Sequence, residues 1–149
     1  MSIPERLYKM GVTTEEDVLR RFSKQLNPRV KCDGVPLSRD YTVRPLWSRW
    51  VKRETAQEAE KWFATQYPKN FFCKQQYNGI TECRDWTVAE SFNFQKLLDT
   101  EYKKTPEYFD LVKTLSARQL IDRGYVKLYY VMLTRKEITA ANTIYSKGE

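Results

Sequence analysis

Apolar residues recur at intervals of three or four positions along most of the chain, which is the spacing of one face of an α-helix. The first run follows Thr13, and Glu16 three residues later completes the pattern of a capping box. This run ends at an Asn-Pro turn sequence. A second run covers 46–67, with aromatic residues on one side, charged residues on the other and a proline directly after it. Both patterns predict helices.

Further helices are predicted in the second half of the chain. Residues 72–86 carry apolar side chains at helical spacing, with Asn78-Gly79 as a kink. Thr87 and Glu90 form a second capping box, and Thr105 precedes a proline at the first position of another helix. The last apolar stretch, YVKLYYVML, has strand propensity. Because a single strand would lack a partner, we expect a helix there as well.

These elements predict the fold class. Residues 27–45 contain three prolines and several cations, which is typical of an extended loop. A chain of 149 residues is long enough for one domain with a sizeable core. The sequence therefore predicts a single all-α domain over 1–149, with five to six helices in an irregular small bundle and a proline-containing basic loop at about 27–45.

The charge is positive and uneven. The chain carries a net charge of +7, and the stretch 29–53 holds seven basic residues against two acids. A positive field attracts an acidic protein, a nucleic acid or anionic lipid headgroups. Aromatic residues, which make up 14% of the chain, are favoured at protein interfaces. We assign partner docking to basic and aromatic residues of this stretch: Arg44, Trp47, Arg49, Trp50, Lys52 and Arg53.

The two tryptophans of this stretch allow three interpretations. Arg and Lys could follow phosphates while Trp47 and Trp50 stack on bases, as in proteins that bind single-stranded nucleic acid. The same residue types are preferred anchors in protein interfaces. In the third interpretation both rings face the core, which their three-residue spacing favours on a helix.

Residues for catalysis or metal binding are scarce. The chain has no histidine, and so it lacks the commonest general base and the commonest metal ligand. It has neither a C-x2-C pair nor a nucleotide-binding or hydrolase motif. We therefore expect no enzyme, no metal site and no cofactor. No apolar run is long enough for a transmembrane segment, and the first residues resemble neither a secretory signal nor a transit peptide.

The chain has three cysteines, and two of them lie in the run FFCKQQYNGITECRDW. Nine residues separate Cys73 from Cys83. Ten positions along a helix rise about 15 Å, so these two thiols cannot bond to each other if the run is helical. They are either buried apolar groups in a reducing compartment or halves of disulfides in an oxidising one.

The cysteine run resembles one arm of the twin C-x9-C, or coiled-coil-helix-coiled-coil-helix, family of the mitochondrial intermembrane space. Cys73, Lys74, Tyr77, Glu82 and Cys83 match the form C-K-x-x-Y-x-x-x-x-E-C, which occurs in accessory subunits of respiratory complex I. Related arms occur in a subunit of cytochrome c oxidase. The resemblance implies a mitochondrial location peripheral to the inner membrane, on the intermembrane-space side if the cysteines are oxidised, and the cytosol otherwise.

The second arm of the motif is missing, because 87–104 contains no cysteine. Within this chain, the disulfide that the resemblance implies is limited to Cys32 with either Cys73 or Cys83. Cys32, Cys73 and Cys83 are therefore the candidate disulfide residues.

The function that we expect from these features is that of a non-catalytic structural accessory subunit of a large multi-protein assembly. The resemblance points to a mitochondrial respiratory-chain complex of the complex I or cytochrome c oxidase type, with the other protein subunits as partners. Two alternatives stay open. One is an RNA-binding or ribosomal protein, including a mitoribosomal one, that uses 29–53, and the other is a small viral or regulatory protein-binding module.

Overall fold

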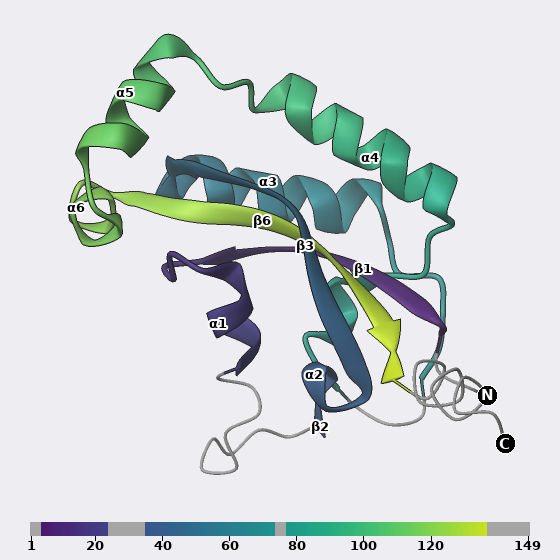
Figure 1. Ribbon diagram of the computed structural model, residues 1–149. Helices are drawn as coiled ribbons and strands as arrows, with labels where there is room; N and C mark the ends of the chain where they lie inside the picture. Colours follow the sequence, from purple (N-terminus) through teal and green to yellow (C-terminus); the bar gives the residue numbers. More distant parts are fainter. Residues whose placement is uncertain (1–3, 24–34, 74–76, 137–149) are drawn as a thin grey trace, which may run out of the picture.

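The computed structural model describes residues 4–23, 35–73 and 77–136 of the chain (Figure 1). Its centre is an antiparallel sheet of four strands in the order β3-β6-β1-β5. These strands are β1 (Arg6–Thr13), β3 (Tyr41–Lys52), β5 (Cys83–Arg84) and β6 (Tyr125–Arg135). A second, parallel pair consists of β2 (Val35–Pro36) and β4 (Tyr77–Asn78).

Helices cover both faces of the four-stranded sheet (Figure 1). One face packs against α3 (Arg53–Gln66) and α4 (Val88–Glu101). The other packs against the short elements α1 (Val18–Ser23), α2 (Leu37–Asp40) and η2 (Ile80–Glu82). The chain returns from α4 to β6 through α5 (Pro106–Thr114) and α6 (Ala117–Asp122).

The central strand β6 contributes to both cores. Leu128 and Tyr130 join the cluster below α3 and α4, whereas Tyr129, Val131 and Leu133 join the cluster on the opposite face. All five side chains are buried because β1 and β3 flank the strand and helices cover both of its faces. This arrangement places the basic strand β3 at one edge of the sheet.

The all-α prediction is wrong. The stretch YVKLYYVML is β6, and its partners are β1 and β3, neither of which was predicted as a strand. Of the predicted helix 46–67, residues 46–52 belong to β3 and only α3 is helical. The pattern is ambiguous here because Pro45 lies at a bulge, where β3 shifts register against β6 and interrupts a two-residue alternation.

Three other predicted elements also differ from the structure. Thr13 ends β1 and accepts a hydrogen bond from the backbone of Glu15, so it does not begin a helix at that point. The predicted loop 27–45 lies partly outside the described residues, and from residue 35 onward it contains β2, α2 and the start of β3. The predicted helix 72–86 consists, where it is described, of β4, η2 and β5 joined by irregular backbone.

The helix starts predicted at Thr87 and Thr105 are confirmed. Thr87 and Glu90 make both hydrogen bonds of the capping box that opens α4. The hydroxyl oxygen of Thr105 accepts from the backbone N–H of Tyr108, and Pro106 is the first residue of α5. These signals are local, so they survive a wrong assignment of the fold class.

Candidate functional site

Three adjoining cavities follow the space between α3 and α4, and together we call them the α3–α4 groove. The first, of about 460 Å³, lies where β3 meets α5, the middle one measures about 470 Å³, and the third measures about 410 Å³. Thr55, Glu101 and Tyr102 line both the first and the middle cavity. Leu97 lines both the middle and the third. The shared residues show that the cavities are neighbours.

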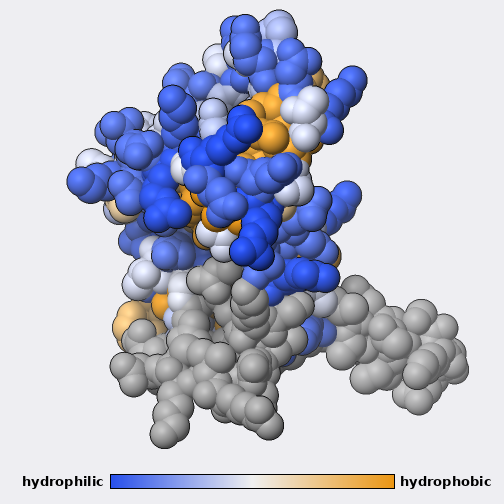
Figure 2. All heavy atoms as spheres, turned by 90° about the vertical axis from the view of Figure 1, so that its left-hand side faces the viewer, coloured by the Kyte–Doolittle hydropathy of each residue, from blue (hydrophilic) through white to orange (hydrophobic). Residues whose placement is uncertain are grey.

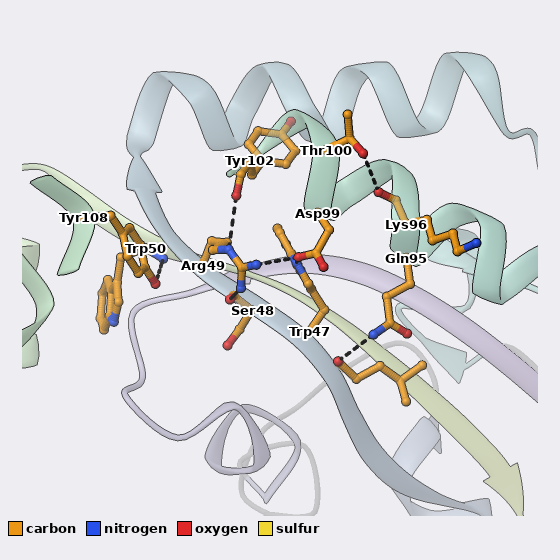
Figure 3. Close-up of polar contacts among 11 residues, drawn as sticks. Trp47, Ser48, Arg49, Trp50, Gln95, Lys96, Asp99, Thr100, Tyr102 and Tyr108 are labelled. Atoms are coloured by element: carbon orange, nitrogen blue, oxygen red, sulfur yellow. Dashed lines mark hydrogen bonds and ion pairs between the residues drawn. The ribbon is translucent and has the colours of Figure 1, made fainter. Parts of the chain in front are cut away.

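Arg49 organises the end of the groove at β3, which we call the basic end (Figure 3). Its Nε donates to the carbonyl oxygen of Tyr102 at 3.1 Å, and its Nη2 lies 2.5 Å from Oδ1 of Asp99. The same Oδ1 accepts from Nε1 of Trp47 at 3.0 Å, and the guanidinium lies 4.9 Å from the centre of that ring. These contacts fasten the C-terminal part of α4 to the edge strand.

Side chains from β3 itself and from both neighbouring helices satisfy backbone groups of β3 (Figure 3). The carbonyl of Leu46 accepts from the Gln95 side chain at 3.2 Å, and that of Ser48 accepts from Arg49 Nη1 at 2.8 Å. The N–H of Trp50 donates to the hydroxyl of Tyr108 at 3.4 Å. An edge strand with such partners does not offer these groups to another strand. These three backbone groups are therefore not free to bind a ligand at this end.

The structure places the predicted docking residues in two groups. Trp47 and Trp50 are each only 7% exposed, and their rings lie on opposite faces of the sheet. Trp47 packs against Tyr102 on the α4 side, whereas Trp50 lies below the ammonium group of Lys127, 5.1 Å from it. Their burial agrees with the core interpretation, although they sit on a strand. Docking through this stretch stays a prediction.

Of the remaining predicted docking residues, three are exposed to solvent and one is held by hydrogen bonds within the fold. Arg44, Lys52 and Arg53 face solvent, and of these Lys52 lines the first cavity. Arg49 also lines this cavity, but Asp99, Ser48 and Tyr102 occupy its donors. Lys103, which the sequence pattern did not single out, adds a further cation to the lining.

The rest of the groove is aromatic and acidic, and we call it the acidic part. Its aromatic residues form one packed group, with ring centres 5.9 Å apart for Trp62 and Phe94, 5.3 Å for Tyr67 and Trp86, and 4.9 Å for Trp86 and Phe94. Glu58 and Glu101 line the middle cavity, and Glu90 lines the third. Among the described residues that line these two cavities, none is Lys or Arg.

The carboxylates of the acidic part affect a neighbouring tyrosine, and one of them is fixed by a hydrogen bond. Burial, together with the charges of Glu101 and Glu58, raises the pKa of Tyr102 above its ordinary value. Glu90 is held in place by the capping box, since its Oε1 accepts from the backbone of Thr87 at 3.1 Å. The acidic part is thus a negatively charged, aromatic cavity next to a basic one.

Two of the three cysteines lie inside the fold. Cys73 and Cys83 are free thiols and are buried in the core opposite α3 and α4. Burial raises the pKa of the Cys83 thiol to about 12. Cys32 falls outside the described residues, so the predicted pairing stays a prediction.

Two searches for special sites give plain results. Within 4–23, 35–73 and 77–136, no cluster of three or more His, Cys, Asp or Glu side chains could hold a metal ion. In the same residues, none of the helices has the length and apolar character needed to cross a membrane.

No family model, curated protein or solved structure matches the chain. The mitochondrial and respiratory expectation therefore has no support. The twin C-x9-C resemblance itself stays a prediction, although the described part of the cysteine run does not form the single helix that its apolar spacing predicted.

Sequence reasoning missed the acidic part of the groove. Glu58 is one of the charged residues on the polar side of the predicted helix 46–67, and Glu90 entered only as part of a capping box. The available signal was the pairing of an acid with an aromatic residue four positions later, as in Glu58–Trp62 and Glu90–Phe94. On a helix this spacing places both side chains on the same side. That two such helices lie side by side was not visible in the pattern.

Proposed function

We propose that the chain is a non-catalytic protein-binding module that docks an acidic, partly apolar segment of a partner protein at the basic end of the groove. The observation that carries this proposal is the uncovered apolar side of α5, which borders the first cavity through Tyr108.

Helix α5 has an apolar side that its own chain covers incompletely. Tyr108, Phe109, Leu111 and Val112 fall within one arc of the helix, and none of them is buried. Phe109 is 47% exposed and Val112 is 37% exposed. Figure 2 shows an apolar patch with hydrophilic surroundings at the height of α5. Such a patch on a soluble domain is typical of an interaction site.

The charge around this patch indicates the kind of partner. Arg49, Lys52 and Lys103 line the first cavity together with a single acid, Glu101. The ammonium group of Lys104 lies 5.8 Å from the ring centre of Phe109. Complementary potentials steer and orient partners. An acidic segment with a large apolar residue fits both the cations and the patch.

Two other partners suggested by the positive charge have weaker support. Sequence-tolerant binding of single-stranded nucleic acid depends on exposed aromatic rings that stack on bases. Trp47 and Trp50 are buried, which leaves Phe109 as the exposed large ring beside these cations among the described residues. One such ring can stack on one base but does not form a platform for successive bases. Anionic headgroups would meet the same cations and the same apolar side chains. We rank them lower because the first cavity, of about 460 Å³, accommodates an inserted side chain better than a layer of headgroups. Both partners are distinguished from an acidic protein segment by the experiment below.

Selection from a displayed library of random short peptides tests the proposal. We expect the enriched peptides to combine Asp or Glu with a large apolar residue. Binding should be lost on Lys52→Glu and on the double substitution Phe109→Ser with Val112→Ser. The matched control, Lys136→Glu, reverses an exposed charge at the far end of β6 and should leave binding unchanged.

Two results would overturn the proposal. The first is enrichment of peptides without acidic residues, or of none. The second is retention of poly(U) RNA or of phosphatidylserine vesicles, lost on Lys52→Glu, by a chain that binds no acidic peptide. Circular dichroism of each variant should match the parent chain, because all the altered residues are exposed.

A further inference from the structure

We infer that the acidic part of the α3–α4 groove binds a small organic cation, such as an alkylammonium or guanidinium compound with an apolar body. This inference rests on a different part of the groove from the proposed function and does not depend on it.

The size and lining of the two cavities suit a small molecule. Their volumes of about 470 and 410 Å³ lie in the range of small-molecule sites, and they adjoin at Leu97. Aromatic and aliphatic side chains form most of the lining: Trp62, Leu97 and Tyr102 in the middle cavity, and Tyr67, Trp86 and Phe94 in the third. An apolar body can therefore bury against rings while a polar group stays near the carboxylates.

The charge of the lining selects a cation. Glu58, Glu90 and Glu101 are the charged residues among the described lining of the two cavities. The lining of these two cavities is thus acidic, although the chain as a whole carries a net charge of +7. All three glutamate side chains are exposed, so water screens their charge in part. Their carboxylates still repel an anion, whereas a cation finds a carboxylate at each cavity.

The aromatic rings strengthen the same preference. Tyr67 packs edge-on against Trp86 and Phe94, at angles of 71° and 84°, and all three rings line the third cavity. The face of an aromatic ring attracts an ammonium or guanidinium group, most strongly for Trp. A ring cluster combined with carboxylates therefore favours a cation over a neutral molecule of the same shape.

The buried side chain of Arg84 lies next to the aromatic cluster. Arg84 is buried, lies 4.6 Å from the ring centre of Phe63 and donates to the carbonyl oxygen of Tyr67. Its Nη1 donates to the carbonyls of Thr81 and Cys83. These oxygens satisfy donors of its guanidinium group, and Arg84 does not line either cavity. The charged side chains that a ligand meets in the two cavities are therefore Glu58, Glu90 and Glu101.

An NMR titration of the four tryptophan indole N–H signals tests the inference, with choline as the probe and 3,3-dimethyl-1-butanol as its neutral isostere. Trp62 and Trp86 line the acidic part, so their signals should shift with choline. Trp47 and Trp50 lie outside it and should not shift. The neutral isostere should bind several-fold more weakly.

Glu90→Gln is the informative variant, because glutamine at the same position also completes a capping box and should leave α4 intact. We expect it to weaken choline binding about two- to fivefold. The matched control, Glu107→Gln, removes an exposed carboxylate on α5 and should leave choline binding unchanged.

The inference is overturned if choline shifts neither signal. Equal affinities for choline and its isostere, or for the parent chain and Glu90→Gln, would overturn it as well. Lys52→Glu and the Phe109/Val112 double variant should bind choline like the parent chain. Loss of peptide binding with normal choline binding, or the converse, therefore shows which of the two proposals fails.

Discussion

The guanidinium of Arg49 and the carboxylate of Asp99 lie 2.5 Å apart and join the edge strand of the sheet to the C-terminal part of α4. The side chain of Arg49 is 12% exposed, whereas that of Asp99 is 61% exposed. The carboxylate thus reaches inward from the surface to a cation that has little contact with water. This geometry fixes the position of the basic end relative to the rest of the groove.

Asp99→Ala should destabilise the protein, because it removes the acceptor that Trp47 and Arg49 share. We expect the free energy of unfolding to fall by about 1–2 kcal/mol, since two nearly buried donors lose their acceptor. Urea denaturation followed by tryptophan fluorescence measures the change. Asp85→Ala, at an exposed position outside the groove, is the control and should stay within about 0.5 kcal/mol of the parent chain. Equal losses for both variants would contradict the assigned role.

Gly11→Ala should destabilise the sheet from within. A Cβ at Gly11 would lie 2.5 Å from Oη and 2.7 Å from Cζ of Tyr129, the residue directly opposite on β6. Overpacking of this kind costs about 1–3 kcal/mol. Tyr129→Leu shortens the obstructing side chain, so the double variant should be more stable than the sum of the single losses indicates. Strict additivity in thermal denaturation would rule out this contact as the cause.

We expect the protein to lose stability at alkaline pH, because the buried Lys9 then loses its charge. Its Nζ lies 3.1 Å from Oε2 of the half-exposed Glu82. Burial lowers the pKa of Lys9, but neighbouring groups, Tyr129 and Glu82 among them, more than offset this, so the pKa lies above its ordinary value. Because the pKa of Lys9 is raised in the folded state, its charged form contributes fully to the free energy of unfolding at every pH below the ordinary lysine pKa. It is lost as the pH rises through the folded-state pKa.

Two variants test this assignment. Glu82→Gln should cost about 1–2 kcal/mol at neutral pH, because it leaves a buried ammonium group without its carboxylate, a loss moderated by the exposure of Glu82. Lys9→Met should flatten the alkaline part of the stability profile. Urea midpoints from neutral to strongly alkaline pH provide the profile. Parallel curves for Lys9→Met and the parent chain would show that another group is responsible.

The buried thiols should resist alkylation. Iodoacetamide reacts with the thiolate, and the raised pKa of Cys83 keeps that residue protonated at neutral pH. We expect Cys83 to react about a hundredfold more slowly in the native protein than in urea. Peptide mapping by mass spectrometry separates it from Cys73 and Cys32. Rapid native labelling of Cys83 would be incompatible with its position in the core.

Local signals in the sequence predicted helix starts better than the fold class. The capping box at Thr87 and the N-cap at Thr105 depend on neighbouring residues, and both are present. The capping box predicted at Thr13 is equally local but wrong, because Thr13 is the last residue of β1. Strand β6 depends on partners far away in the chain. Its burial on both faces removes the alternation that would have revealed a strand, and its partner β3 is interrupted by Pro45 at a bulge. Without recognised partners, a strand prediction for β6 had little basis.

Local signals also decide how much of the candidate site could be predicted from the sequence. The density of cations around Lys52 is a local property, and two of these cations, Arg49 and Lys52, line the first cavity. The neighbouring acidic part combines Trp62 from α3 with Glu90 from α4. Such a surface follows only from the way two helices pack on one face of a sheet, which no short window of sequence contains.

The position of β6 in the chain also affects how the protein is made. Among the described strands, β6 is the last to emerge during translation, yet it separates β1 from β3 in the finished sheet. Until Tyr125–Arg135 leaves the ribosome, the nascent chain holds two strands that cannot pair through their native partner. Unpaired strands at this stage attract other chains. The yield of folded protein should therefore depend on how quickly the ribosome completes the last strand.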